Sequence, residues 1–209
     1  MDTPLSTRAV LKIKRIARRF SATEREFQRI WPMIQPIGGW LMEGQEKWLF
    51  KRARSLKDGT NIVEIGSYKG RSTCCLGFGC KGTKKHVFAI DRFDGGPDLP
   101  RYDSFAEFCA NVKRCGLSEC VEPVIGTSSE IARTWNKPIQ LLFIDGSHLY
   151  EDVLLDFEGF FPHVVRGGMV AFHDVREDHP GVLKAWHGII KQQLAGVGYC
   201  SSIGYGRKP

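Results

Sequence analysis

After residue 60, short apolar runs alternate with stretches whose apolar residues recur at helical spacing. The apolar runs are Asn61–Ile65, His86–Ile90, Val121–Ile125, Ile139–Ile144 and Met169–Phe172. The helical stretches lie near 70–79, 104–115, 128–135 and 150–161, followed by Gly181–Leu194, and the tail Gly198–Tyr205 offers one or two further strands. This alternation predicts an α/β fold: a doubly wound, Rossmann-like, mostly parallel sheet with helices on both faces. In such a sheet ligands bind at the carboxyl ends of the strands.

The first 58 residues follow a different, helical pattern. Residues 5–20 form an amphipathic stretch whose apolar face holds Val10, Ile13, Ala17 and Phe20. Two prolines and a glycine pair predict a loop from Trp31 to Gly39, and Glu43–Leu56 is again helical. We therefore expect residues 1–58 to form a helical appendage that lies over the ligand cleft as a lid, and residues 59–209 to form one compact unit.

Composition narrows the class of protein. The 209 residues are 42% apolar and 25% charged, which is ordinary for a globular chain. Seven cysteines without a CxxC pair, and no apolar export signal near the start, favour reduced thiols and a cytoplasmic location. No apolar run is long enough to cross a membrane.

The net charge of +7 is a local feature. Six basic residues and no acid lie between Thr3 and Thr23, which leaves +1 for the remainder. A nearly neutral body argues against nucleic acid as the partner. The basic helix at 5–20 is either a solvated surface or a peripheral contact to an anionic membrane surface or an acidic partner.

The first strand runs into the sequence VEIGSYKGRST, residues 63–73. Gly66 and Gly70 allow a tight turn and a close approach of the backbone to a ligand. The GxGxxG phosphate-binding pattern is absent, and an acid, Glu64, precedes the turn. A carboxylate there would repel a pyrophosphate but suits a cationic ligand such as S-adenosylmethionine, which carries an ammonium and a sulfonium.

The next two strand ends carry residues suited to an adenosine. Asp91, which ends the second strand, can accept hydrogen bonds from both ribose hydroxyls, as in NAD sites, or can simply hold a turn. Gly126 can let an adenine lie close. Ser128 can donate to the adenine or cap the following helix.

The fourth and fifth strands end in Asp145 with His148 and in His173 with Asp174. Neighbouring strand ends bring these groups together. They could bind Mg²⁺ or Mn²⁺ through oxygen and imidazole ligands. They could equally form a metal-free acid/base pair, in which a carboxylate orients a histidine.

Four segments together carry a family resemblance: VEIGSYKGRST (63–73), AIDRF (89–93), FIDGSHLYED (143–152) and GGMVAFHD (167–174). From about Gly38 to the C-terminus the chain resembles the class I S-adenosylmethionine-dependent methyltransferases. Within these it is similar to the small O-methyltransferase group that includes cephalosporin-hydroxylase-like and macrocin-type sugar O-methyltransferases. The resemblance implies the strand order 3-2-1-4-5-7-6, and the short tail suggests a reduced final hairpin.

The resemblance also implies roles for single residues. Glu64, Gly66 and Ser67 would bind the methionine part, Asp91 the ribose, and Gly126 and Ser128 the adenine. Further candidate cofactor-binding residues are Tyr68, Gly70, Ser72, Arg92 and Asp145. Asp145 and Asp174 match positions at which metal-dependent relatives hold Mg²⁺, with His173 where some relatives have an acid.

The function expected from these residues is methylation of a hydroxyl on a small molecule or sugar. His148, His173 and Asp145 are the candidate catalytic residues, Asp145, His173 and Asp174 the candidate metal ligands, and the insert Asp94–Asp103 would shape the acceptor pocket. Three alternatives stay open: an RNA methyltransferase, an NAD-dependent oxidoreductase and a non-catalytic nucleotide-binding module. The oligomeric state is also open, with a homodimer as one alternative.

Overall fold

The computed structural model of the protein describes residues 22–95 and 102–209. The basic helix predicted at residues 5–20 and most of the insert Asp94–Asp103 lie outside the described residues. Within the described residues, no helix is both long and apolar enough to cross a membrane.

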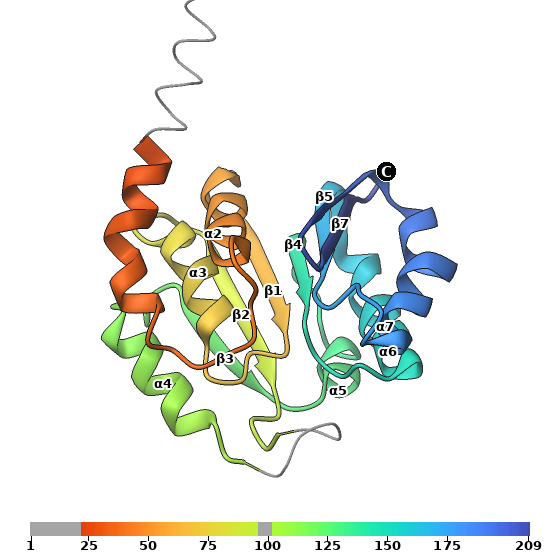
Figure 1. Ribbon diagram of the computed structural model, residues 1–209, viewed down its shortest axis with the longest axis horizontal. Helices are drawn as coiled ribbons and strands as arrows, with labels where there is room; N and C mark the ends of the chain where they lie inside the picture. Colours follow the sequence, from red (N-terminus) through yellow and green to blue (C-terminus); the bar gives the residue numbers. More distant parts are fainter. Residues whose placement is uncertain (1–21, 96–101) are drawn as a thin grey trace, which may run out of the picture.

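A seven-stranded sheet forms the centre of the molecule (Figure 1). Its strands are β1 (Asn61–Ile65), β2 (His86–Asp91), β3 (Val121–Ile125), β4 (Ile139–Ile144), β5 (Val164–Phe172), β6 (Ala195–Cys200) and β7 (Ile203–Arg207). The order is β3-β2-β1-β4-β5-β7-β6. The first five strands are parallel, and β7 runs antiparallel to both β5 and β6. The predicted fold class and strand order are thus confirmed, whereas the final hairpin is complete rather than reduced.

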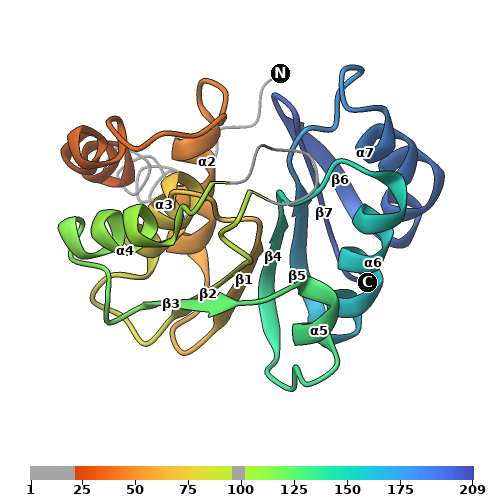
Figure 2. The same cartoon turned by 90° about the horizontal axis from the view of Figure 1, so that it is seen from below.

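Helices cover both faces of this sheet (Figure 2). On one side lie the helix at residues 22–34, α2 (Gln45–Ser55), α3 (Arg71–Cys80) and α4 (Phe105–Arg114). On the other lie α5 (Ser128–Ala132), α6 (Tyr150–Phe160) and α7 (Pro180–Ala185). Successive residues of β4 point to opposite faces, so that Phe143 joins the core under α2 and α3, and Leu142 joins the core under α6. Burial on both faces explains the continuous apolar runs.

Four predicted boundaries were wrong. Strand β5 begins at Val164, five residues before the expected start at Met169. The loop expected from Trp31 begins only after residue 34, because Phe27, Ile30 and Ile34 form a buried stripe at helical spacing. The helix after Ser128 ends at Ala132, where the chain tightens and turns Trp135 inward against Phe88.

The fourth difference concerns the stretch 181–194, which is not one helix. Helix α7 passes into a π-helical turn at Trp186–Ile190 and a 3₁₀ turn at Lys191–Gln193. A second 3₁₀ turn, Phe161–His163, leads into β5.

The appendage packs closely against the sheet domain. Gly79 of α3 lies against α2, where an added Cβ would come within 2.5 Å of Ala53 Cβ. Beside this contact the buried Lys85 Nζ donates to the carbonyl oxygens of Ala53 and Gly79, each at 2.8 Å. Among the described residues 22–58, those that line the ligand cleft are Gly38, Gly39, Trp40 and Leu41. Neither the helix at residues 22–34 nor α2 therefore forms the expected lid, because both lie on one face of the sheet.

Candidate active site

A cavity of about 660 Å³ opens at the carboxyl ends of the parallel strands, a volume typical of small-ligand sites. Most residues predicted for the site line it: Gly66, Ser67, Tyr68, Ser72, Asp91, Arg92, Gly126, Ser128, Asp145, His148, His173 and Asp174. Two predicted residues, Glu64 and Gly70, do not. The strand ends therefore bring the predicted chemistry into one place, as the doubly wound fold requires.

Gly66 is required by the turn after β1. Its φ of 84° lies in the left-handed region, and a Cβ on it would stand 2.1 Å from the carbonyl oxygen of Asp145. The Gly66 N–H donates to the Ile90 carbonyl (2.9 Å), and the Asp145 N–H donates to the Ile65 carbonyl (2.8 Å). The turn is thus fixed between β2 and β4, where its backbone faces the cavity.

Glu64 lies beneath this turn. It is fully buried, and its Oε2 accepts hydrogen bonds from the hydroxyls of Ser67 and Thr73. Burial raises the pKa of Glu64 to about 7, against the lowering effect of its hydroxyl partners. Glu64 was expected to contact the methionine part of the cofactor, but its side chain does not line the cavity. In the structure Glu64 instead holds Ser67, which does line the cavity.

The Asp91 carboxylate accepts hydrogen bonds from the backbone of the loops around it. Its Oδ2 accepts from the N–H groups of Ser67 (2.7 Å) and Tyr68 (2.8 Å), and its Oδ1 from that of Phe93 (2.6 Å). The turn-holding alternative is thus realised. Asp91 still lines the cavity, and each carboxylate oxygen has more than one lone pair, so ribose binding stays a prediction.

Near Gly126 the cavity has an acid that the sequence did not single out. Asp156 of α6 is buried, lines the cavity and accepts a hydrogen bond from the Ser128 hydroxyl. Burial raises the pKa of Asp156 to about 7, although the bond from Ser128 lowers it. The helix start is capped by Thr127, in a capping box with Glu130. The capping role considered for Ser128 therefore belongs to its neighbour.

Asp156 predicts a pH dependence of stability. Between its ordinary pKa of 3.8 and about 7, the folded chain holds the proton at this site more tightly than the unfolded chain. The contribution of Asp156 to the free energy of unfolding therefore falls as the pH rises through this window. Asp156→Asn, which cannot ionise, should gain stability relative to wild type as the pH rises. Urea unfolding across the window measures the difference, with the exposed Asp178→Asn as control. A difference that does not change with pH would contradict the assignment.

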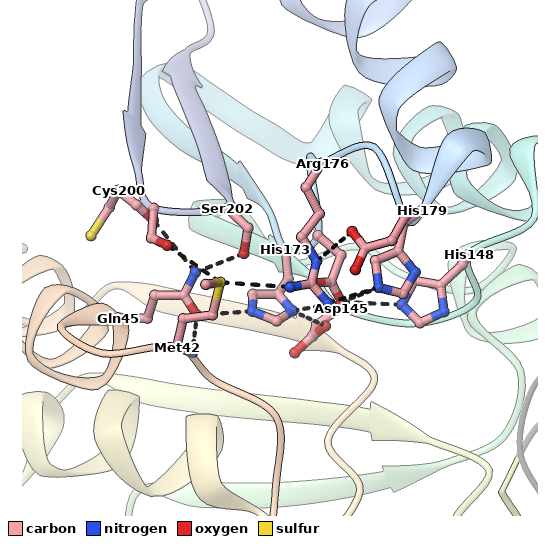
Figure 3. Close-up of polar contacts among 12 residues, drawn as sticks. Met42, Gln45, Asp145, His148, His173, Arg176, His179, Cys200 and Ser202 are labelled. Atoms are coloured by element: carbon pink, nitrogen blue, oxygen red, sulfur yellow. Dashed lines mark hydrogen bonds and ion pairs between the residues drawn. The ribbon is translucent and has the colours of Figure 1, made fainter.

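At the other end of the cavity, two carboxylates face one histidine. His173 Nδ1 lies 2.9 Å from Asp145 Oδ1 and 3.0 Å from Asp174 Oδ2, and its Nε2 lies 2.9 Å from Gln45 Oε1. Figure 3 shows His173 between Gln45 and Asp145. Burial alone would lower the pKa of His173, but Asp145 and Asp174 outweigh it and raise the pKa to about 10. Asp145, His173 and Asp174 place their ligand atoms close enough to share one metal ion.

Asp174 also contacts a second group of side chains. His148 Nε2 lies 3.2 Å and His179 Nε2 lies 3.7 Å from Asp174 Oδ2, and the two imidazoles stack with centroids 4.1 Å apart. Arg176 Nε lies 3.2 Å from Asp174 Oδ1. Burial would raise the pKa of Asp174, but hydrogen bonds from His148 and His173 lower it below its ordinary range. His148, Asp174 and His179 form a second possible metal-ligand group, although Arg176 already supplies a positive charge there.

The sequence analysis did not predict several of the residues that line the cavity. Trp40 packs against Tyr68 in a tilted arrangement, with ring centroids 4.8 Å apart, and stays largely exposed at the cavity mouth. His179 and Arg176 follow β5 in the loop before α7, where the HDVREDH sequence was a usable signal. Asp156 belongs to a helix, and its direction cannot be read from its sequence position alone.

Comparison with known proteins decides the family. The family described as a methyltransferase domain (Methyltransf_24) matches residues 63–175, more than half of the chain. The chain belongs to this methyltransferase family. The match includes every predicted site residue from Glu64 to Asp174, and it confirms the family resemblance drawn from the motifs.

Curated relatives of this methyltransferase-family chain are distant. The uncharacterized protein R132 of Acanthamoeba polyphaga mimivirus is 27% identical over 150 residues, which cover 67% of this chain and 63% of R132. The uncharacterized protein y4gI of Sinorhizobium fredii is also 27% identical, and the matched region covers 17% of its length. The chain thus spans under two thirds of either relative.

Solved structures share the fold of this family member. The methyltransferase PaMTH1 of Podospora anserina, solved with SAH bound, has a TM-score of 0.67 at 14% identity and covers 100% of this chain and 99% of its own. An O-methyltransferase from Bacillus cereus, in complex with SAH, has a TM-score of 0.62 at 19% identity and covers 90% and 91%. At these identities the likeness extends to the fold.

Proposed function

We propose that the chain transfers a methyl group from S-adenosylmethionine to a hydroxyl of a small molecule or sugar, assisted by a divalent cation such as Mg²⁺ or Mn²⁺. One observation carries the proposal. One cavity brings the Gly66 turn together with the neighbouring cluster of Asp145, His173 and Asp174. The O-methyltransferases among the similar structures support the reaction type.

The residues present fit the cofactor. A Cβ at Gly66 would collide with the Asp145 carbonyl oxygen, so glycine allows the turn to follow its path along the cavity wall. Asp145 and Asp91 put carboxylates along the cavity wall, which suits an ammonium and ribose hydroxyls. When bound, S-adenosylmethionine supplies a methyl group already activated by its sulfonium. The chain's own task is to position the acceptor in line and to take its proton.

His148 is the side chain we assign to proton removal. The Asp174 carboxylate orients its imidazole through Nε2 and would stabilise the imidazolium that forms when the hydroxyl proton is taken. His173 is less suited to this role, because Gln45 occupies one ring nitrogen and two carboxylates face the other. His173 is therefore assigned with Asp145 and Asp174 to the cation. The near-neutral charge of the chain outside its N-terminal basic stretch supports a small acceptor over RNA.

Calorimetry separates the candidate cofactors. S-adenosylmethionine and its demethylated product should both bind, and NAD should not, because the turn lacks the GxGxxG glycine pattern of dinucleotide sites. Binding of NAD alone would reject the proposal in favour of an oxidoreductase.

Methyl transfer tests the reaction and the cation together. We expect labelled methyl groups to pass from S-adenosylmethionine to hydroxyl compounds in a metabolite extract, to stop in excess chelator, and to resume when Mg²⁺ or Mn²⁺ is restored. Full turnover in chelator would reject the cation. Label found only in RNA would reject the small acceptor, and no transfer to any extract would favour a non-catalytic binding module.

A further inference from the structure

Gln45, the first residue of α2, brings a buried side-chain amide to the cation end of the cavity (Figure 3). Its Oε1 accepts a hydrogen bond from the Met42 N–H (2.6 Å). Its Nε2 donates to the Ser202 hydroxyl (2.9 Å) and faces the Cys200 carbonyl oxygen (3.4 Å). A backbone N–H can only donate and a carbonyl can only accept, so the amide cannot be turned over.

This orientation determines the tautomer of His173. Gln45 Oε1 can only accept, and it lies 2.9 Å from His173 Nε2, so Nε2 must carry a hydrogen. In the neutral ring, Nδ1 then presents a lone pair. That lone pair faces Asp145 Oδ1 at 2.9 Å and Asp174 Oδ2 at 3.0 Å. Three electron-rich atoms meet at the cavity wall, two of them on the buried side chains of His173 and Asp174, and they require a positive centre among them, either a proton on Nδ1 or a metal ion.

The separations of these atoms match those of a metal-ligand set. Adjacent ligands of an octahedral ion with bonds near 2.1 Å are about 3.0 Å apart, which agrees with both distances from Nδ1. The set contains one imidazole nitrogen and two carboxylate oxygens. Imidazole favours first-row transition ions, whereas Mg²⁺ prefers oxygen ligands. The nitrogen therefore shifts the preference of the site away from Mg²⁺.

We propose that Gln45 is a positioning residue that presents His173 Nδ1 to the cation, and that the resulting centre selects Mn²⁺ or Co²⁺ over Mg²⁺. The inference rests on the proposed function only for the presence of a cation at this end of the cavity. Gln45 lies outside the region matched by the family, residues 63–175. The appendage would thus set the metal preference of a site whose ligands come from the sheet.

Metal titration of the full-length protein tests the selectivity. After chelation and dialysis, Mn²⁺ and Co²⁺ should bind at least about tenfold more tightly than Mg²⁺. His173→Asp restores an all-oxygen set and should reduce the ratio of the Mg²⁺ to the Mn²⁺ dissociation constant at least about tenfold. Gln45→Met removes the acceptor for Nε2–H and should weaken Mn²⁺ binding about 10–100-fold, while the exposed Gln28→Met should match wild type.

Paramagnetic resonance identifies the ligand directly. Bound Mn²⁺ should show hyperfine coupling to a nitrogen, and His173→Asp should remove it. Coupling that persists in His173→Asp would place the ion with His148 and His179 and overturn the inference. An unchanged metal ratio in His173→Asp, or unchanged Mn²⁺ affinity in Gln45→Met, would also overturn it.

Binding of the demethylated cofactor product, measured on the same samples, distinguishes failure of the metal inference from failure of the proposed function. Normal binding by Gln45→Met and His173→Asp shows that the variants are folded. If wild type binds Mn²⁺ selectively but not the cofactor product, the proposed function fails and the metal inference stands. If wild type binds the product but shows no preference among the three ions, or binds none, the metal inference fails.

Discussion

Gly66→Ala should abolish binding of S-adenosylmethionine and lower the free energy of unfolding by about 3–5 kcal/mol. The added Cβ would lie 2.1 Å from the Asp145 carbonyl oxygen and 2.8 Å from Gly146 Cα, distances that rigid strand ends cannot relieve by moving a side chain. The turn after β1 would have to move away from β4, and the cavity wall would move with it. Calorimetry with the demethylated product and urea unfolding measure the two effects.

Gly82→Ala is the matched control. Gly82 also has a left-handed φ, 71°, but nothing lies within 4 Å of its expected Cβ. Its substitution should therefore reduce stability only by the cost of the backbone conformation, about 1–2 kcal/mol, and should leave cofactor affinity unchanged. Equal losses in the two variants would show that backbone conformation, and not contact with β4, makes Gly66 necessary.

Asp174→Asn should reduce methyl transfer by a factor on the order of 10³. One carboxylate here contacts His173, His148 and Arg176, so an amide in its place removes charge both from the proposed cation site and from the proposed base. Affinity for the demethylated product should change little, because the Gly66 turn and Asp91 remain intact. Single-turnover transfer of labelled methyl groups separates the two quantities.

Asp178→Asn tests whether the loss of methyl transfer in Asp174→Asn comes from the shared carboxylate itself or from a displaced Arg176. Asp178 is mostly exposed and pairs with the same guanidinium, at 3.0 Å from Arg176 Nε. Since exposed ion pairs contribute little, this variant should keep the wild-type rate. A rate as low as that of Asp174→Asn would mean that orientation of Arg176, not the shared carboxylate, limits the reaction.

Most of the sheet could be predicted from the sequence because its strands are buried on both faces. The run Ile139–Ile144 has no polar residue except Gln140, and it is β4 to the residue. The positions of Asp145, His173 and Asp174 could be predicted equally well, because a polar residue directly after a buried strand lies at a fixed edge of the sheet. The strand order itself came from the family resemblance, since apolar periodicity does not distinguish one neighbour from another.

Contacts between distant segments could not be predicted in this way. Gln45 and His173 are 128 positions apart, and a glutamine at the start of a helix is usually exposed. Asp156 looks like an ordinary polar position of an amphipathic helix, yet it is turned toward Ser128. The burial of Glu64 beneath the turn could not be predicted for a related reason. Its neighbours Ser67 and Thr73 fold back over it, and that path of the chain depends on the turn at Gly66.

The ammonium of Lys85 has a consequence for how such domains can be recombined. It joins the last turns of α2 and α3 by donating to Ala53 and Gly79, and it sits where Gly79 permits the two helices to touch. Removing the first 58 residues would take away two of the three carbonyl acceptors of this buried cation, those of Ala53 and Arg54, and would leave an apolar helix face in water. The helical appendage is therefore not a transferable module. A chimera that exchanges it would have to take α3 and Lys85 along, and with them the first crossover of the sheet.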